Sequence, residues 1–242
     1  AVGGAGAATI DPAGQTLRTN AILVGAGAGA LTIGTGTNNG SLAAAAAGGE
    51  LLLINNTANA LTVNSVIADN TSASALSMVG DVTLNGNNTY AGETYLTGGT
   101  LVIANGNALG DTAAGTTISD GATLALQGGI TVGAEALNLA GTGISGNGAM
   151  RNVSGSNTYG GLITLTDAAR INSDSGMLTL DAASGAAVTG EFNLTLGGAG
   201  NITVADPIAT GAGQVTKDGA GTVILAGANT YTGATTVSAG ED

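Results

Sequence analysis

The chain has 242 residues, of which 44 are Gly, and it carries no Cys, no His and a formal net charge of −12. The absence of Cys excludes disulfides, zinc–thiolate sites and thiol catalysis, and the absence of His removes the commonest general base. The basic residues, Arg18, Arg151, Arg170 and Lys217, are scattered, so the sequence excludes a cationic patch for nucleic acid or for an anionic membrane surface.

Short apolar runs between Gly, Asn and Asp turns dominate the chain, and a mean hydropathy of +0.35 argues against low-complexity disorder. Runs of three to five apolar residues are too short for helices and fit strands. The strands predicted in chain order are 16–18, 21–24, 30–33, 50–54, 60–67, 75–79, 82–84, 95–97, 100–103, 116–118, 123–126, 130–132, 137–139, 151–153, 162–165, 169–171, 177–180, 192–196, 202–204, 214–216, 222–225 and 235–237.

Residues 43–47 are all Ala and could form one helical turn, because Ala has the highest helix propensity. The Gly residues that flank this run favour a small-residue strand or loop instead, and this is the interpretation we adopt.

A motif of the form G-x-N-T-Y-x-G occurs three times, at 86–92, 155–161 and 227–233. Its Asn and Tyr residues are the candidate structural sites: Asn88, Tyr90, Asn157, Tyr159, Asn229 and Tyr231. The spacings of the tyrosines along the chain are 159 − 90 = 69 and 231 − 159 = 72. A near-constant period of this kind indicates a repeat architecture.

This period predicts an all-β fold: a single parallel β-helix, or β-solenoid, of about ten coils that spans residues 1–242 as one domain. We expect three coils of about 23–24 residues between successive motifs, with the three corners equivalent in space. Leu84, Leu101, Leu124, Leu180, Leu196 and Leu225 are predicted to face the core. Gly and Asn accept positive φ at little cost, which leaves this conformation open at the corner Asn residues.

The stretch 217–240, K-D-G-A-G-T-V-I-L-A-G-A-N-T-Y-T-G-A-T-T-V-S-A-G, resembles the passenger-associated transport repeat of bacterial autotransporters. The stretch 82–110 matches it too, including Gly99-Thr100-Leu101 and Asn107-Ala108-Leu109-Gly110, whereas 155–161 keeps only the corner. The resemblance implies an extracellular right-handed parallel β-helix that assists secretion of a passenger, and it specifies no ligand or reaction.

Three carboxylates, Asp167, Asp174 and Asp181, are the most tempting catalytic set, because solenoid enzymes that act on polysaccharides use clustered carboxylates. Their spacing of seven places them after successive strands, where they would point in different directions and stabilise turns. The chain has no calcium-loop motif, so we expect no cofactor and leave only adventitious surface calcium open. Tyr90, Tyr95, Tyr159 and Tyr231 could stack on sugars, but three of them sit in the repeated corner and are interpreted as structural plugs.

The patterns predict a structural, non-catalytic function, that of a surface spacer or a filament subunit. The resemblance to autotransporters adds an adhesin passenger, and it implies a location outside the cell or on the surface of a bacterium, after export through the outer membrane. The alternatives are a carbohydrate-active or carbohydrate-binding β-helix protein, including a binding module whose ligand lies along a ladder of Thr and Asn. Surface glycans are the ligands that this interpretation allows. The sequence has no run of about 18–20 apolar residues, so we expect no membrane insertion by this segment.

Neither end of the sequence shows a polar or helical cap, and Ala1-Val2-Gly3-Gly4 has no signal-peptide pattern. We therefore expect either a segment of a longer passenger or subunits that stack head to tail, each covering the open coil of the next.

Overall fold

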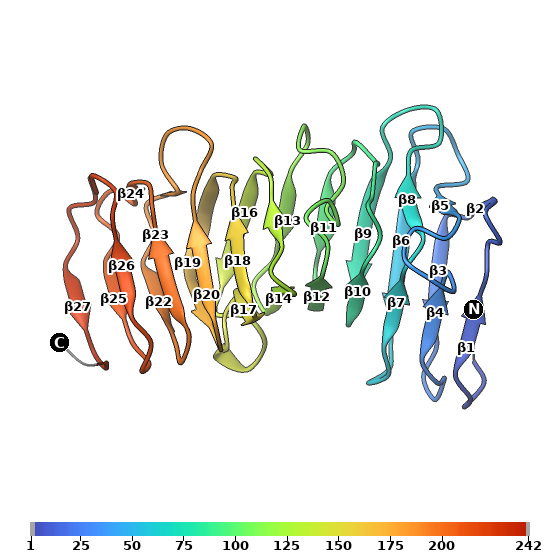
Figure 1. The fold of residues 1–242 in the computed structure, drawn as a ribbon, viewed down its shortest axis with the longest axis horizontal. Coiled ribbons are helices and arrows are strands. Elements are labelled where there is room, and N and C mark those ends of the chain that lie inside the picture. Colours follow the sequence, from blue (N-terminus) through green and yellow to red (C-terminus); the bar gives the residue numbers. More distant parts are fainter. Residues whose placement is uncertain (1–2, 241–242) are drawn as a thin grey trace. The chain divides into compact units, whose positions relative to one another are not determined.

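The computed structural model describes residues 3–240, and it divides the chain into two compact units, Ala1–Thr116 and Thr117–Asp242. Figure 1 shows that each unit is built of short strands that lie side by side, as predicted for a solenoid. The prediction of one domain over residues 1–242 stays a prediction, and each unit is described by itself.

Unit 1 winds through three parallel ladders of strands. The first ladder is β1-β4-β7-β10-β12, the second is β3-β6-β9-β11 and the third is β2-β5-β8. The bounds are β1 (Ala8–Ile10), β2 (Thr16–Arg18), β3 (Ala21–Val24), β4 (Leu31–Ile33), β5 (Ser41–Ala43), β6 (Glu50–Asn55), β7 (Leu61–Val63), β8 (Val66–Ala68), β9 (Ala75–Val79), β10 (Val82–Leu84), β11 (Thr94–Leu96) and β12 (Gly99–Ile103).

Unit 2 repeats this arrangement. Its ladders are β14-β17-β19-β22-β25-β27, β15-β18-β20-β23-β26 and β16-β19-β21-β24, where the long strand β19 contributes to two of them. The bounds are β13 (Thr116–Ile118), at the boundary of the units, β14 (Ala122–Gln127), β15 (Thr131–Val132), β16 (Leu137–Gly141), η1 (Ile144–Gly146), β17 (Met150–Ser154), β18 (Ser156–Tyr159), β19 (Ile163–Ser173), β20 (Met177–Leu180), β21 (Val188–Thr189), β22 (Leu194–Gly198), β23 (Asn201–Val204), β24 (Ile208–Ala209), β25 (Val215–Lys217), β26 (Val223–Leu225) and β27 (Thr235–Val237).

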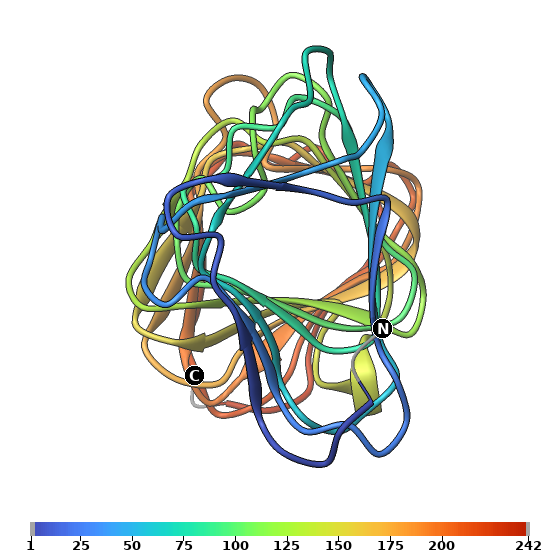
Figure 2. The same ribbon diagram turned by 90° about the vertical axis from the view of Figure 1, so that its right-hand side faces the viewer.

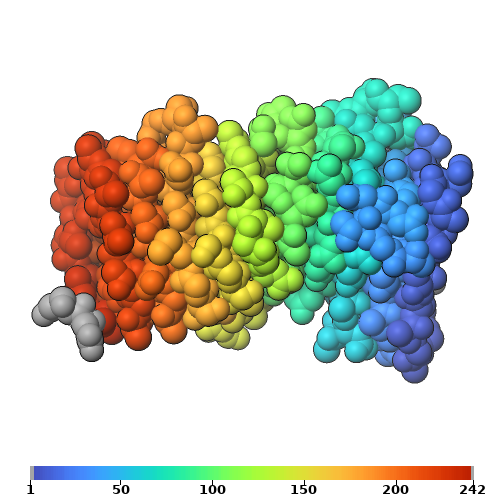
Figure 3. Space-filling model, viewed as in Figure 1, coloured from blue at the N-terminus to red at the C-terminus, as the bar shows by residue number. Residues whose placement is uncertain are grey.

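The short strands form because apolar and polar residues alternate, which puts the apolar ones on one side of a pleated strand. In β4, Leu31 and Ile33 are fully buried while Thr32 lies outside. Turned by 90°, the ribbon of each unit runs around an interior, which these side chains fill (Figure 2). The space-filling view shows successive segments of each unit as adjacent bands (Figure 3). The parallel β-solenoid of about ten coils is therefore confirmed. Its core consists mainly of aliphatic side chains and contains few aromatic rings.

The predicted core residues are confirmed in five of six cases. Leu84, Leu101, Leu124 and Leu196 are fully buried and Leu180 is almost so, whereas Leu225, in β26, is only half-buried. Beyond β26 and β27, no further coil lies among the described residues, so the inward side chains there remain uncovered.

The expectation of a constant coil length is wrong. Leu31 pairs with Leu61, a step of 61 − 31 = 30 along the chain, whereas Val82 pairs with Leu101, a step of 101 − 82 = 19. The coils differ because loops of different length leave the ladders at the turns, and loop insertions cost little when the strands at their ends are fixed.

Several strand boundaries differ from the prediction for local reasons. The run 60–67 is two strands, because the chain bends at Asn64-Ser65, and the stretch 162–171 forms one strand from Ile163 to Ser173. The strands β1, β5, β18, β21 and β24 were not predicted, since they are short or rich in Thr, Asn and Ala. The Ala run after β5 forms a turn rather than a helix, which confirms the favoured interpretation.

Candidate functional site

The first motif, 86–92, lies next to β8 and extends the third ladder of unit 1 by one position. We call a segment at one position of a ladder a rung. Asn88 is 3% exposed and bonds to the coils on both sides. Its Oδ1 accepts the backbone N–H of Ile67 at 2.8 Å, and its Nδ2 donates to the carbonyl of Ala108 at 2.6 Å. One amide side chain thus satisfies two backbone groups that the ladder leaves unpaired.

The other two motifs repeat this bond with the same kind of partner. Asn157 Oδ1 accepts the backbone N–H of Ile130 at 2.7 Å, and Asn229 Oδ1 accepts that of Ile208 at 2.8 Å. Asn157 is buried, and its Nδ2 also donates to the side-chain oxygen of Asn152. The motif Asn is therefore a clamp between a rung and the coil before it.

The expected spatial equivalence of the corners is wrong within unit 2. Asn157 belongs to β18, in the ladder β15-β18-β20-β23-β26, whereas Thr230, beside Asn229, donates to Ile208 of β24, at the end of the ladder β16-β19-β21-β24. The two motifs lie on different faces, so the spacing between them is not a whole number of coils. The inserted loops absorb the difference.

Positive φ, which the sequence left open at the motif Asn residues, does not occur at Asn88, Asn157 or Asn229. Among the described residues, positive φ occurs at Gly and at Ala13, Asn38, Thr71 and Ser145. The motif needs Asn for its side-chain amide, and the neighbouring glycines serve close packing: a Cβ on Gly86 would collide with the backbone of Ser65.

The tyrosines of the motifs behave differently from one another. The hydroxyls of Tyr90 and Tyr231 bond to Thr94 Oγ1 and Thr235 Oγ1, at 2.6 and 2.7 Å. In the second motif, Ile163 takes the place of this Thr. The buried Tyr159 hydroxyl therefore has no hydrogen-bond partner within the part of the chain that the structure describes. Burial raises the pKa of the Tyr159 phenol well above its ordinary value, and the charge of Glu135 adds to the rise.

The three aspartates of the catalytic alternative do not converge. Asp167 lies exposed within β19. Asp174 and Asp181 flank opposite ends of the four-residue strand β20, which is about 13 Å long at ~3.3 Å per residue. The placement of Asp167 after a strand end was wrong, since β19 continues through it.

Asp174 is part of a network that joins coils of unit 2. It pairs with Arg151 Nη2 at 2.5 Å and accepts Asn172 Nδ2 at 2.8 Å. Asn172 in turn accepts Arg170 Nη2 at 2.9 Å, and Arg170 holds Asp218 through both terminal nitrogens, at 2.6 and 2.8 Å. Two of the four cationic side chains of the protein are therefore used to link its own coils.

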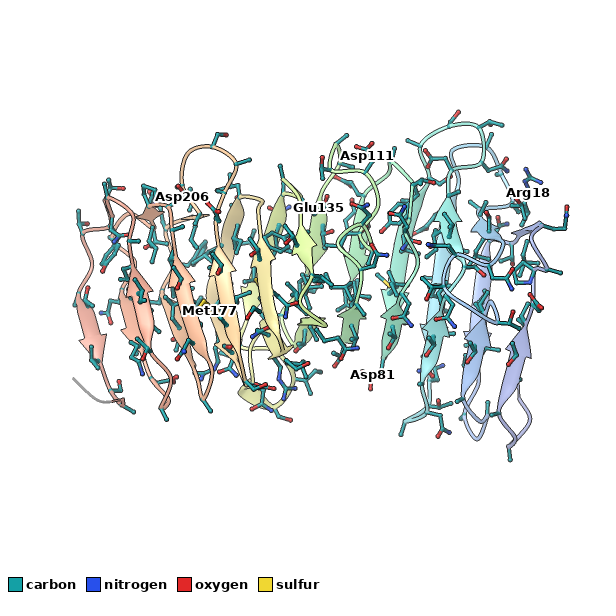
Figure 4. All side chains as sticks on the ribbon, in the orientation of Figure 1. Arg18, Asp81, Asp111, Glu135, Met177 and Asp206 are labelled. Carbon is teal, nitrogen blue, oxygen red and sulfur yellow. The ribbon has the colours of Figure 1, made fainter. Side chains whose placement is uncertain are left out.

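A polar hollow of about 350 Å³ lies beside the first motif in unit 1, lined by Asn87, Asn88, Thr89, Asn107, Gly110, Asp111 and Thr112. Figure 4 labels Asp111 there, and Glu135, Asp81, Asp206, Arg18 and Met177 elsewhere. The sequence did not predict this hollow, although two of its lining residues, Asn107 and Gly110, belong to the trailing segment of the repeat.

The described residues hold no group of three or more Asp and Glu side chains close enough to bind a metal ion. In residues 3–240 no helix is long or apolar enough to cross a membrane. The Asn side chains of the motifs complete the hydrogen bonding of the backbone between coils.

These features define a class of protein: a parallel β-solenoid whose coils are clamped by a repeated Asn-Thr-Tyr rung. The chain carries the passenger-associated-transport-repeat at residues 79–103 and 215–241, which confirms the resemblance found in the sequence.

A curated relative is the adhesin BmaC autotransporter of Brucella suis biovar 1 (strain 1330), which is 32% identical over 295 aligned residues. The alignment covers 94% of this chain and 9% of the relative, so the chain spans about a tenth of the length of the protein it matches. No solved structure matches the chain.

Proposed function

We propose that this chain is a non-catalytic stretch of an autotransporter adhesin passenger, displayed on a bacterial surface after export through the outer membrane. The observation that carries the proposal is the repeated Asn clamp, because it uses the motif's polar side chains for backbone bonds between coils. The likeness to an adhesin over 94% of the chain supports the same role.

Display of the chain on a bacterial cell that does not adhere tests the adhesive role. We expect increased adherence to animal-cell layers or to coated surfaces, and no release of reducing sugar from extracellular polysaccharides. Turnover of a polysaccharide by the purified chain would contradict the proposal. A display variant that carries Asn88→Ala and Asn157→Ala controls for the folded state, since it loses two of the three clamps and keeps every other residue.

The second part of the proposal concerns the last described coil. In the first repeat, β12 pairs with β10, and Val82 and Leu84 of β10 and Leu96 of β11 are buried. In the last repeat, the equivalent positions, Val223, Leu225 and Val237, line a hollow of about 240 Å³, and Val237 is 61% exposed. The chemistry of this surface suits another coil of the same repeat, from a neighbouring segment or from a second copy stacked head to tail.

Appending residues 100–110 directly after residue 240, which is the equivalent of Gly99, tests this stacking. We expect the added strand to raise the stability of the chain and to abolish end-to-end association in sedimentation experiments. An added strand that changes neither property would contradict it.

The carbohydrate-binding alternative stays a prediction. The polar hollow beside Asn88 offers amide and hydroxyl groups and the carboxylate of Asp111, the groups that sugar hydroxyls bond to, but no aromatic platform among its lining residues. A glycan array with Asn107→Ala as the matched variant tests it.

A further inference from the structure

Four Asn-Gly pairs occur in the chain, at 39–40, 85–86, 105–106 and 147–148. Asn is a thermally labile residue, because the backbone nitrogen of the following residue can attack its side-chain amide carbon. A following Gly hinders this attack least, since it has no Cβ. The local structure around each pair then decides whether the attack occurs.

In the pairs 39–40 and 85–86, an acceptor holds the side-chain nitrogen that the reaction releases. Asn39 Nδ2 donates to Thr35 Oγ1 at 2.6 Å, and Asn85 Nδ2 donates to Asn64 Oδ1 at 2.8 Å. Each bond keeps the side chain in place and has to break before the nitrogen leaves. We therefore expect slow attack at both pairs.

In the pair 147–148, the attacking nitrogen itself is engaged. The backbone N–H of Gly148 donates to the carbonyl of Thr142 at 2.8 Å. Gly148 is buried, and a Cβ placed on it would lie 2.7 Å from the carbonyl oxygen of Met150, so the backbone there has little room to move. The structure therefore protects this pair as well.

The pair 105–106 of unit 1 is arranged for the attack. Asn105 Oδ1 accepts the backbone N–H of Asn107 at 2.9 Å, which closes a turn around Gly106 and holds the side-chain carbon of Asn105 beside the nitrogen of Gly106. The same bond polarises the side-chain carbonyl and stabilises the oxyanion that forms on attack. Asn105 and Gly106 are half-buried, so water reaches them. Asn105 Nδ2 lies 3.5 Å from the carbonyl oxygen of Asn85, which is the limit of a hydrogen bond.

We propose that Asn105 is a site of spontaneous deamidation, which the fold of unit 1 favours over the other three pairs. The backbone nitrogen of Gly106 loses its proton to hydroxide and bonds to Cγ of Asn105. The Cγ–Nδ2 bond then breaks, and the released nitrogen takes up a proton from water and leaves as ammonia, which completes a succinimide ring. Water opens this ring at either carbonyl and leaves an aspartate or an isoaspartate at position 105. The reaction consumes only water.

The modification acts on the clamp of the first repeat. The backbone N–H of Ala108 donates to the carbonyl of Asn105 at 3.1 Å, and the carbonyl of Ala108 accepts Asn88 Nδ2 at 2.6 Å. An isoaspartate adds one carbon to the main chain within this turn, which moves Ala108 away from Asn88. Both products also place a new negative charge beside the polar hollow, which contains Asn107 and the carboxylate of Asp111, labelled in Figure 4.

Peptide mapping by mass spectrometry, after incubation of the folded chain at about pH 8 and about 37 °C, measures the four rates in one sample. We expect deamidation at Asn105 at least ~10-fold faster than at Asn39, Asn85 or Asn147, because one hydrogen-bond donor to a developing oxyanion is worth more than this in enzymes. In guanidinium chloride the four rates should become similar, because the turn and the packing are lost.

Two variants serve as controls. Gly106→Ala should abolish the fast reaction, since its Cβ hinders ring closure, and it keeps the turn, because Gly106 is not among the residues with positive φ. Asn105→Ser removes the amide. The aged parent should melt at a lower temperature than the fresh parent, and both variants should keep their melts on ageing.

Equal rates at the four pairs of the folded chain, or a faster reaction at another pair, would overturn the proposal. A rate at Asn105 that Gly106→Ala leaves unchanged would do the same. An aged parent that is modified at Asn105 and melts like the fresh protein would overturn the loosening of the clamp.

Discussion

The side-chain oxygen of Asn88 accepts the backbone N–H of Ile67 across 2.8 Å, between one coil of unit 1 and the coil before it. The equivalent bonds of Asn157 to Ile130 and of Asn229 to Ile208 show that this is a property of the repeat. The Asn side chain of the motif therefore stabilises the stack of coils, because it bonds a backbone N–H group that the ladder of backbone hydrogen bonds leaves unpaired.

Replacing Asn88 with Ala should lower the free energy of unfolding by about 2–3 kcal/mol, because it leaves the N–H of Ile67 and the carbonyl of Ala108 without their buried partner. Replacing the exposed Asn229 should cost only about 0.5–1 kcal/mol, since water replaces the lost bond. Urea denaturation measures both. Asn56, which is exposed, is the control for loss of an Asn, and an equal effect at Asn56 and Asn88 would contradict the clamp.

The Tyr hydroxyls allow a comparison between two copies of the motif. Tyr90→Phe should destabilise the protein by about 1 kcal/mol, because it removes the bond to Thr94. Tyr159→Phe should be neutral or stabilising, because the hydroxyl that it removes is buried without a hydrogen-bond partner in residues 3–240. Thermal melts of the two variants decide this, and a larger loss for Tyr159→Phe than for Tyr90→Phe would refute the assignment.

The same Tyr159 hydroxyl should make stability depend on alkaline pH. Burial raises its pKa in the folded state above the ordinary value of about 10, so below that pH both states are protonated and the contribution to stability is constant. Above about pH 10 the unfolded chain ionises at this residue and the folded chain does not, so stability falls as pH rises. Urea unfolding of the parent and of Tyr159→Phe from about pH 8 to 11 should diverge only above about pH 10; parallel curves would rule this out.

The adjacent glycines Gly98 and Gly99, at the start of β12, offer a matched pair. Gly99 has φ +86°, and a Cβ there would overlap the backbone of Gly80, whereas a Cβ on Gly98 meets nothing. Gly99→Ala should therefore cost about 2–4 kcal/mol through strain and displaced strands, and Gly98→Ala should be near neutral. Chemical denaturation of both variants checks this. Equal free energies of unfolding for Gly98→Ala and Gly99→Ala would contradict the prediction, because the turn would then accommodate a Cβ at position 99 without strain.

The sequence by itself determined the fold class. Alternation of apolar and small polar residues in runs such as Leu31-Thr32-Ile33, between glycines that turn the chain, leaves stacking as the way to bury one face of each strand. The strand positions and most of the inward leucines follow from this alternation, which has a period of two residues. The Asn-Thr-Tyr motif identifies the repeat.

Only the tertiary structure decided what the motif does and where it lies. The period of the motif does not reveal that Asn157 and Asn229 lie on different faces, because loop length is free to vary between fixed strands. The role of Asn as a clamp depends on which residues of distant coils become neighbours. Strand register sets that pairing, and register is a property of the folded stack.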